Sequence, residues 1–430
     1  MPPSRPHRAT LGPMLVFSVV TAHSRCDPVR LPTKHGIGIG PQGTVCRCNE
    51  SFCDAIDAVG VIPPKGFVAY ATSLHNDTER LTRFEGLLEV RAAGHVISID
   101  VSQRFQTMLG FGAAFTDASV LSYRALTPAA RANLLRAYWG EGGLRYSVGR
   151  IPVGSTDFST SVYSYNDEEW ASPGREDLNL THFSVEVDEH SGKLPLIRHV
   201  QALASETANT AVGGPSRAPV RNLSLFGSCW APPPWMTTKN TTINAVLRGR
   251  PGGAIHGAYA DYLVRFVSEY RRRGVDVWAI TGGNEPGGNT GKWQDLRFTA
   301  AEQRDFIKRD LGPRLRQLQS HCSLMILDDQ RARLPQWADT VLADVEAAQY
   351  VDGIGVHWYA ATEELLPFWR RLSETHSRHP GVFILGTEAS EGYLPWSGGV
   401  YPGSWLRGER YAQDVIEDVN NHAVGWTGGT

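Results

Sequence analysis

From about residue 105 onward, short apolar runs alternate with stretches in which apolar residues recur every three or four positions. The runs at 223–230, 275–281 and 354–359 are mostly apolar, as expected of strands that are buried on both faces. Before one of them, Tyr259, Tyr262, Leu263 and Phe266 fall at helical spacing, and Gly274 follows as a stop signal. Strands that alternate with helices predict a parallel α/β fold.

The pattern predicts eight strands, the number in a (β/α)8 TIM-type barrel. They lie at residues 106–115, 144–153, 223–230, 275–281, 324–327, 354–359, 381–387 and 423–426. Two helix starts are marked by Thr127-Pro128 and by Thr299 with Glu302, which forms a capping box. Because Gly428-Gly429-Thr430 follows the start of the eighth strand, we expect a barrel that is truncated there and lacks its final helix.

Residues 26–103 show no helical periodicity, and short runs at 87–90 and 95–99 predict strands. They form a small β-rich appendage before the barrel at 104–430. Four of the six cysteines lie in it: Cys26, Cys46, Cys48 and Cys53. Their C-x-C and C-x4-C spacings differ from the paired C-x-x-C of zinc sites, so we interpret them as disulfide-forming.

Residues 1–25 have the layout of a secretory signal peptide, because Arg5, His7 and Arg8 precede a short apolar run at 11–20. Sequons at Asn49, Asn76, Asn179, Asn222 and Asn240 agree with a glycoprotein of an oxidising compartment. No stretch approaches the ~20 apolar residues of a membrane span. The net charge of −2 gives no sign of a nucleic-acid partner.

Two glutamates follow predicted strands in the same way. Glu285 comes after the strand at 275–281 and before Pro286, and Glu388 comes directly after the strand at 381–387. They are separated by about three βα units of roughly 30 residues, which suits strands 4 and 7 of one barrel. Barrel enzymes carry their catalytic groups at the carboxyl ends of strands. A facing pair of carboxylates there predicts glycoside hydrolysis, with retention of configuration at a separation of ~5–5.5 Å.

Other strand-end residues predict the surroundings of this pair. Arg150 and Tyr359 are candidate donors that keep a nucleophilic carboxylate charged, and Asn284 is a candidate donor to the sugar 2-hydroxyl. Asp157 is expected to accept hydrogen bonds from sugar hydroxyls, and Trp230 to offer an apolar face.

Three further features have a structural interpretation. Adjacent aspartates on a strand point to opposite faces, so Asp328-Asp329 predicts a structural ion pair and not a metal site. His357 is interpreted as a core histidine with satisfied nitrogens, and Cys229 as a buried free thiol. We expect no metal ion and no cofactor.

Several motifs stand together and in order: Gly110-Phe111-Gly112, Arg150-Ile151-Pro152, Asp157-Phe158-Ser159, Asn284-Glu285-Pro286, Leu327-Asp328-Asp329-Gln330, Val356-His357-Trp358-Tyr359 and Thr387-Glu388-Ala389. With them the chain resembles the acid glucosylceramidases (acid β-glucosidases) of glycoside hydrolase family 30, from about Cys46 to Trp426. The resemblance implies Glu285 as acid/base and Glu388 as nucleophile. It further implies pocket residues and disulfides, namely Arg150, Asp157, Trp230, Asn284 and Tyr359, with Cys26–Cys46 and Cys48–Cys53.

The resemblance also implies a substrate, a location and partners. The substrate is glucosylceramide at an acidic membrane surface, cleaved to glucose and ceramide. The location is the lysosomal lumen, on the membrane, and the partners are a saposin-type activator protein and a lysosomal transport receptor.

The chain departs from the family in three places. Thr427-Gly428-Gly429-Thr430 stands where the family has Thr-Asp-Trp-Asn, the loop after Pro286 is shorter, and the β appendage is incomplete. Two alternatives therefore stay open: a catalytically inactive truncated form that only binds a ligand or partner, and another family-30 specificity such as β-xylosidase.

Overall fold

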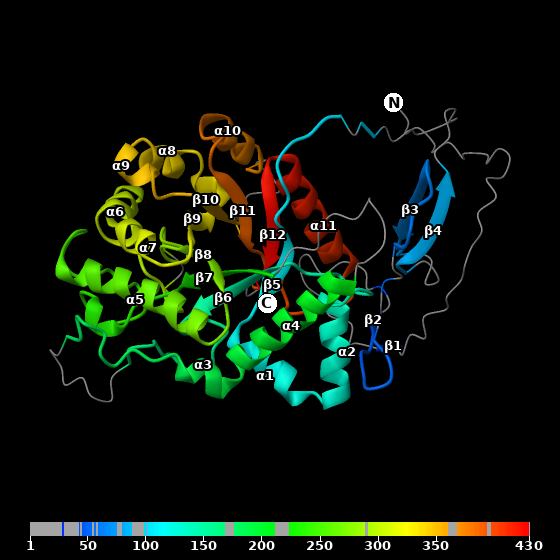
Figure 1. Ribbon diagram of the computed structural model, residues 1–430, viewed down its shortest axis with the longest axis horizontal. Helices are drawn as coiled ribbons and strands as arrows, with labels where there is room; N and C mark the ends of the chain where they lie inside the picture. The colour runs from blue at the N-terminus through cyan, green and yellow to red at the C-terminus, as the bar shows by residue number, and fades with distance from the viewer. Residues whose placement is uncertain are drawn as a thin grey trace, which may run out of the picture.

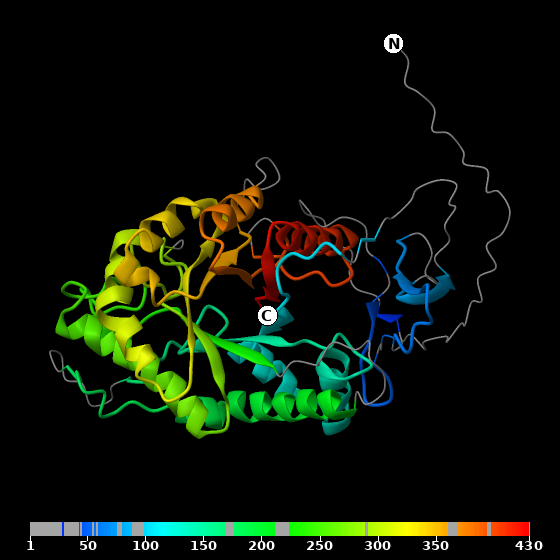
Figure 2. The ribbon, with the colours of Figure 1, turned by 45° about the horizontal axis from the view of Figure 1, so that its top comes forward.

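The computed structural model describes residues 28–29, 43, 45–53, 56, 59–74, 80–87, 99–100, 102–167, 176–210, 223–288, 291–359, 368–393 and 397–429. Its centre is a closed barrel of parallel strands, surrounded on the outside by helices (Figure 1). Two small antiparallel sheets lie to one side of the barrel, on the right in Figures 1 and 2.

All eight predicted barrel strands are present. They are β5 (Gly110–Ala114), β6 (Val148–Val153), β7 (Ser224–Cys229), β8 (Val277–Thr281), β9 (Ser323–Gln330), β10 (Gly353–His357), β11 (Phe383–Glu388) and β12 (Ala423–Gly428). Each strand pairs in parallel with the next, and β12 pairs with β5 to close the barrel. The sequence predicted only the start of the eighth strand, but β12 extends two residues further and pairs with β5 along Gly425–Gly428.

The helices lie between successive strands in the chain. They are α1 (Asp117–Ala125), α2 (Pro128–Trp139), α3 (Glu186–Ser191), α4 (Lys193–Thr210), α5 (Ala254–Arg272), α6 (Ala300–Phe306), α7 (Gly312–Arg316), α8 (Gln336–Leu342), α9 (Val345–Ala348), α10 (Arg370–Arg378) and α11 (Trp405–Asn420). Short 3-10 turns at Pro234–Met236 and Arg331–Arg333 and a π-helical turn at Ile307–Leu311 complete the list. The predicted caps are confirmed: Thr127 accepts a hydrogen bond from Ala130, and Thr299 forms a capping box with Glu302. No helix of the described chain has both the length and the apolar character that crossing a membrane requires.

The amino-terminal region is β-rich, as predicted. Strands β1 (Pro28–Val29) and β2 (Val45–Cys46) pair with each other, and β3 (Gly66–Ala71) pairs with β4 (Thr82–Leu87). The disulfide between Cys48 and Cys53 is confirmed. Cys26 lies outside the described residues, and so do residues 1–25 and 88–98, which carry the predicted signal peptide and most of two predicted strands.

The barrel interior is apolar at its amino-terminal end. Side chains from five strands meet there: Val148, Phe226, Ala279, Met325 and Leu385. A larger apolar core fills the space between the strands and the surrounding helices. These two layers bury the barrel strands on both faces, which explains their mostly apolar sequences.

A polar layer lies above this apolar layer. In four of these strands, the residue two positions after the apolar one is polar and buried: Arg150, Ser228, Thr281 and Thr387. Alternate residues of a strand share a face, so these side chains also point into the barrel. They converge on Asp328 of β9, which accepts hydrogen bonds from Thr281 at 2.9 Å, Thr387 at 2.7 Å and Arg150 at 3.1 Å, and also from Ser228.

Asp328 reaches the barrel interior through an irregularity of β9. Leu327 and Asp328 have positive φ angles of 66° and 57°, and the pairing of β9 with β10 shifts register at this point. In a regular strand Leu327 would follow Met325 on the inner face. The irregularity turns the Asp328 carboxylate inward instead, where it forms an ion pair with Arg150. The sequence predicted an ion pair here but not its partner.

One seam of the barrel wall carries no helix on its outer side within the described ranges. A groove of about 1100 Å³ runs along β5 and β12, between α1 and α2 on one side and α11 on the other. Its lining is chiefly apolar and includes Leu134, Leu135 and Trp139 of α2 and Val415 and Ile416 of α11. The outer side of β5 and β12 is therefore flanked by apolar side chains of these helices.

A second buried ion cluster joins α11 to the chain after β9. The Arg331 side chain is 1% exposed and forms ion pairs with both Asp414 and Asp418. Burial raises the pKa of Asp418 to about 7, against the opposing effect of Arg331 and with a further rise from Asp414. Two carboxylates thus share one cation, and the raised pKa of Asp418 favours its protonated form at acidic pH.

Asp328 also lies 3.1 Å from Nε2 of the buried His357. We predict that Asp328→Asn destabilises the fold by about 3–5 kcal/mol, because Arg150 and His357 lose a shared buried counter-charge. Asp329→Asn is the matched control, since Asp329 pairs with the half-exposed Arg333 and its loss should cost about 1–2 kcal/mol. Urea unfolding followed by circular dichroism measures both. Equal losses in the two variants would contradict the central role of Asp328.

We also predict that the protein is more stable at pH 5 than at pH 7.5. A carboxyl whose folded-state pKa is raised contributes stability below its unfolded pKa and loses it as the pH rises through the folded value. For Asp418 this window runs from the usual 3.8 to about 7, and the loss is on the order of a few kcal/mol. Denaturation midpoints should fall as the pH rises across this range. Asp418→Asn should make the midpoint less dependent on pH while keeping the Arg331–Asp414 pair.

Candidate active site

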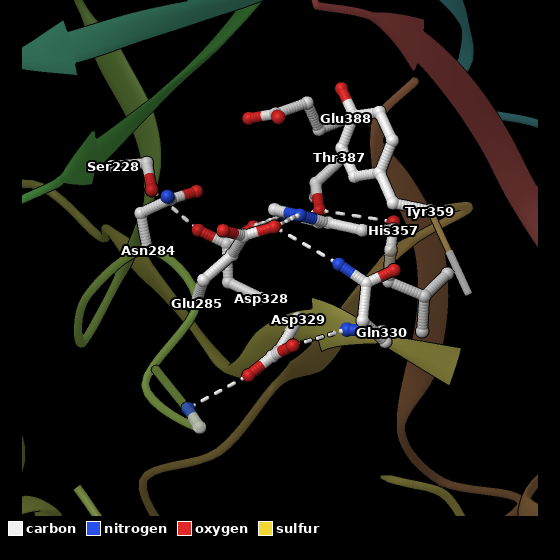
Figure 3. Close-up of polar contacts among 12 residues, drawn as sticks. Ser228, Asn284, Glu285, Asp328, Asp329, Gln330, His357, Tyr359, Thr387 and Glu388 are labelled. Atoms are coloured by element: carbon white, nitrogen blue, oxygen red, sulfur yellow. Dashed lines mark hydrogen bonds and ion pairs between the residues drawn. The ribbon is translucent and has the colours of Figure 1, made fainter. Parts of the chain in front are cut away.

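Glu285 and Glu388 meet at the mouth of the barrel. One carboxylate oxygen of each glutamate and a ring nitrogen of His357 lie within 4.8 Å of one another. The two side chains are 12% and 11% exposed, so both are mostly shielded yet open to the mouth. Figure 3 shows Glu285 and Asp328 around the imidazole of His357, with Glu388 above them. A pair of carboxyl groups this close suits the retaining form of glycoside hydrolysis.

Two neighbouring strands hold the backbone of Glu285. The Asn284 N–H donates to the carbonyl of Cys229 on β7 at 2.7 Å, and the Glu285 N–H donates to that of Asp328 on β9 at 2.9 Å. Glu285 has a φ of 46°, a left-handed conformation that is uncommon for residues with a side chain. The surrounding bonds therefore fix a strained backbone, a feature that is frequent at functional sites.

The Glu285 side chain is fixed at one oxygen. Oε1 accepts hydrogen bonds from Gln330 Nε2 at 2.9 Å and from His357 Nδ1 at 3.2 Å. Burial raises the pKa of Glu285, His357 opposes the rise, and the negative charges of Glu388 and Asp329 add to it. A carboxyl group with a raised pKa holds its proton at mildly acidic pH and can act as a general acid.

Strand register explains why these groups meet. His357 of β10 is opposite Gln330 of β9 and also opposite Glu388 of β11, so three side chains come from three adjacent strand ends. The Glu388 carboxylate forms an ion pair with Arg150 of β6, across the barrel. Tyr359 lies beside Glu388 (Figure 3), and burial together with this negative charge raises the pKa of Tyr359 well above 10. The phenol therefore stays protonated as a donor.

His357 is buried between carboxylates. Its Nε2 lies 3.1 Å from Asp328 and its Nδ1 faces Glu285. Burial alone would lower its pKa, but Glu388, Asp328 and Glu285 raise it to about 10. Among the described residues, Glu285, His357 and Glu388 are the group whose spacing would suit a metal ion. A ring nitrogen must lose its proton to bind a metal, and the carboxylates on both sides of His357 favour the protonated ring, so this group fits an ion poorly.

The remaining predicted pocket residues gather around Arg150. Asn284 is buried, and its Oδ1 accepts a hydrogen bond from Arg150 at 2.7 Å. The Trp230 ring is 4.7 Å from the Arg150 guanidinium, a cation–π contact that the sequence did not predict. Asp157 is an exposed residue of the loop after β6. The surrounding protein, which partly displaces water, and the negative charges of Glu388 and Glu285 raise the pKa of its carboxyl to about 7. The influence of both glutamates places its carboxyl near the pair.

Sequence reasoning missed the links between these residues. The two nitrogens of His357 are satisfied, as predicted, but one of the partners is Glu285 itself. The sequence did not predict a site role for Gln330, although Gln330 donates a hydrogen bond to the same Glu285 oxygen. Their positions in the sequence could have indicated a site role, because Gln330 and His357 are the last residues of barrel strands, as Glu388 is. Sequence alone does not give the register that brings them together.

Comparisons with known proteins agree with this geometry. Residues 108–429 match the glycosyl hydrolase family 30 TIM-barrel domain. The chain is 38% identical over 393 residues to putative glucosylceramidase 4 of Caenorhabditis elegans, covering 89% of this chain and 70% of the relative. It is also 38% identical over 398 residues to the lysosomal acid glucosylceramidase of Mus musculus, covering 90% and 72%.

The fold is also similar to that of solved structures. The crystal structure of SrfJ from Salmonella typhimurium superposes with a TM-score of 0.70 over 85% of this chain and 74% of that one, at 23% sequence identity. At this identity the likeness concerns the fold. The family match spans almost the whole barrel, including both glutamates. The chain therefore belongs to glycosyl hydrolase family 30 and is a glycoside hydrolase.

Proposed function

We propose that this protein is a retaining β-glucosidase that hydrolyses glucosylceramide to glucose and ceramide, with Glu388 as nucleophile and Glu285 as acid/base. The observation that carries the proposal is the approach of the two carboxylates, which have oxygens within 4.8 Å of each other. Inverting enzymes keep their carboxyl groups ~6.5–9.5 Å apart to admit a water molecule, whereas retaining enzymes bring them to ~5–5.5 Å.

The reaction takes two steps. In the first, a Glu388 oxygen bonds to the anomeric carbon while the glycosidic bond breaks, and Glu285 gives its proton to the leaving oxygen of ceramide. In the second, Glu285 takes a proton from water, the water oxygen bonds to the anomeric carbon, and Glu388 leaves. Two inversions give glucose in the β configuration.

The contacts of Glu285 suit the acid/base role. Both hydrogen bonds from Gln330 and His357 end on Oε1, which leaves Oε2 to exchange the proton. The raised pKa of Glu285 keeps the proton in place before the first step. Gln330 and His357 orient the carboxyl group and need not touch the substrate.

The contacts of Glu388 suit the nucleophile. Arg150 sets a positive charge against one of its oxygens, and Tyr359 adds a protonated hydroxyl nearby. Arg150 also holds Oδ1 of Asn284, so the amide nitrogen of Asn284 is the group available to donate to the sugar 2-hydroxyl. Asp157 would accept hydrogen bonds from other hydroxyls, and Trp230, whose ring lies 4.7 Å from the Arg150 guanidinium, would offer an apolar contact to the sugar.

The names of the relatives support the lipid substrate and the location that we propose. Both curated relatives above are named as glucosylceramidases, and the mouse protein is named as lysosomal. We accordingly place this protein in the lysosomal lumen at an acidic membrane surface, after removal of residues 1–25 and glycosylation at sequons such as Asn179 and Asn240. A saposin-type activator protein and a lysosomal transport receptor are the proposed partners. Because both carboxylates and their supporting residues are in place, we favour an active enzyme over a form that only binds ligand.

The stereochemical outcome tests the function directly. Hydrolysis of an aryl β-glucoside at mildly acidic pH, followed by proton NMR, should release β-glucose first, with the α anomer appearing only through mutarotation. A Glu388→Gln variant should show no turnover above background. Initial release of α-glucose would contradict the retaining mechanism.

The acid role of Glu285 predicts a dependence on the leaving group. Glu285→Gln should lower kcat on glucosylceramide by about 10²–10⁴-fold, because its alkoxide leaving group needs a proton. With dinitrophenyl β-glucoside, whose phenolate leaves unaided, the first step should be nearly unaffected and the glucosyl-enzyme should accumulate. A burst of phenolate in stopped-flow measurements checks this. Equal loss of the first step on both substrates would exclude the role.

A further inference from the structure

A fully buried lysine lies away from the proposed catalytic pair. Lys193 is the first residue of α4, and its side chain is 0% exposed. The ammonium nitrogen is 2.9 Å from Asp117, 3.0 Å from Asp188 and 3.1 Å from the Tyr163 hydroxyl. An ammonium group has three donors, and each has one partner here. Such a buried charge is costly unless it is paired in this way.

The two carboxylates around Lys193 face different parts of the molecule. Asp188 of α3 is enclosed in the core, where it also accepts hydrogen bonds from the hydroxyls of Tyr165 and Tyr270. Asp117, the first residue of α1, faces the loop that follows β6. It accepts hydrogen bonds from Ser159 Oγ at 2.5 Å and from the Tyr163 hydroxyl at 3.0 Å. Asp117 thus joins the buried cation to this loop.

The loop that Asp117 contacts is the one that carries Asp157. Ser159 Oγ, besides donating to Asp117, accepts a hydrogen bond from the Thr156 N–H at 3.0 Å. The Phe158 carbonyl accepts one from the Ala118 N–H at 3.0 Å. The residues on both sides of Asp157 are therefore tied to the start of α1. A continuous chain of contacts runs from Lys193 through Asp117 and Ser159 to the backbone at Thr156.

The base of the same loop is closed independently. The Ser155 N–H donates to the Tyr163 carbonyl at 3.0 Å, and the Tyr163 N–H donates to Ser155 Oγ at 2.9 Å. Ser155 Oγ also accepts a hydrogen bond from Gln294 at 3.0 Å. These bonds fix where the loop leaves and re-enters the barrel wall. The turn at Asp157 is closed by two local bonds, from the Ser159 N–H to the Thr156 carbonyl at 3.1 Å and from the Phe158 N–H to Thr156 Oγ1 at 3.0 Å. The contacts with Asp117 and Ala118 attach this turn to the start of α1.

We propose that Lys193 is a positioning residue for the sugar-binding pocket: through Asp117 and Ser159 it fixes the turn that presents Asp157 to the substrate. The proposal rests on the proposed function, because it takes Asp157 as an acceptor for sugar hydroxyls. Lys193 itself touches neither the substrate nor the two glutamates. A displacement of about 1 Å at a binding group is enough to lower a rate by up to ~10²-fold, so the anchoring has a measurable effect.

The first test removes the hydrogen bond from Ser159 to Asp117 without touching a charge. Ser159→Ala should raise KM for an aryl β-glucoside about three- to tenfold with little change in kcat, the effect of losing about 1 kcal/mol of binding. Ser161→Ala, at an exposed position of the same loop, is the matched control and should leave KM unchanged. Lys193→Met should also raise KM, and by more than Ser159→Ala does.

A double-mutant cycle distinguishes positioning from a general loss of stability. In an Asp157→Asn background, Ser159→Ala should cause no further rise in KM, while its effect on the urea midpoint should be the same in both backgrounds. An unchanged KM in the single Ser159→Ala variant, or an equal rise in both backgrounds, would overturn the proposal. If Lys193→Met fails to fold, the Ser159→Ala series still decides.

The outcomes also separate this proposal from the proposed function. Release of β-glucose by the unaltered protein tests the hydrolase mechanism and does not depend on Lys193. If that result holds and Asp157→Asn leaves KM unchanged, Asp157 does not bind the sugar, and the positioning role of Lys193 is overturned while the mechanism stands.

Discussion

The site depends on the buried carboxylate of Asp328, which lies between two cations. Arg150 and His357 each bind Asp328 on one side and a proposed catalytic glutamate on the other, Glu388 and Glu285 respectively. Burial raises the pKa of Asp328, but Arg150, His357 and the hydrogen bond from Ser228 lower it well below its usual range. Asp328 therefore remains charged and holds both cations in place.

The charges in this cluster agree with the proposed roles of the two glutamates. Arg150 and His357 contribute two positive charges, and Asp328 and Glu388 contribute two negative ones. The cluster is neutral when Glu285 carries a proton, and a third negative charge would be uncompensated in a mostly buried site. Repulsion by like charges and burial both favour the protonated form of Glu285. The same arrangement that keeps Glu388 paired with a cation thus provides an acid beside it.

The barrel interior supplies the layers that make this cluster possible. An apolar layer closes the amino-terminal end, and a polar layer of Arg150, Ser228, Thr281 and Thr387 lies directly above it. Every oxygen of Asp328 finds donors in this layer, which offsets the cost of burying charge. The cluster around Lys193 follows the same rule outside the barrel: a buried cation is satisfied by two carboxylates and a tyrosine hydroxyl.

The sequence by itself determined the barrel and the two glutamates. Runs such as 275–281 are apolar because their strands are covered on both faces. The carboxyl ends of parallel strands meet at one rim, so the sequence alone predicted that Glu285 and Glu388 lie close together. Only the tertiary structure decided what surrounds them. The left-handed turn at Leu327 and Asp328 brings a carboxylate inward against the regular alternation of β9, and register across β9, β10 and β11 sets Gln330 and His357 against the glutamates. Such contacts join residues far apart in the chain, and their geometry depends on bulges and pairing that local preferences do not specify.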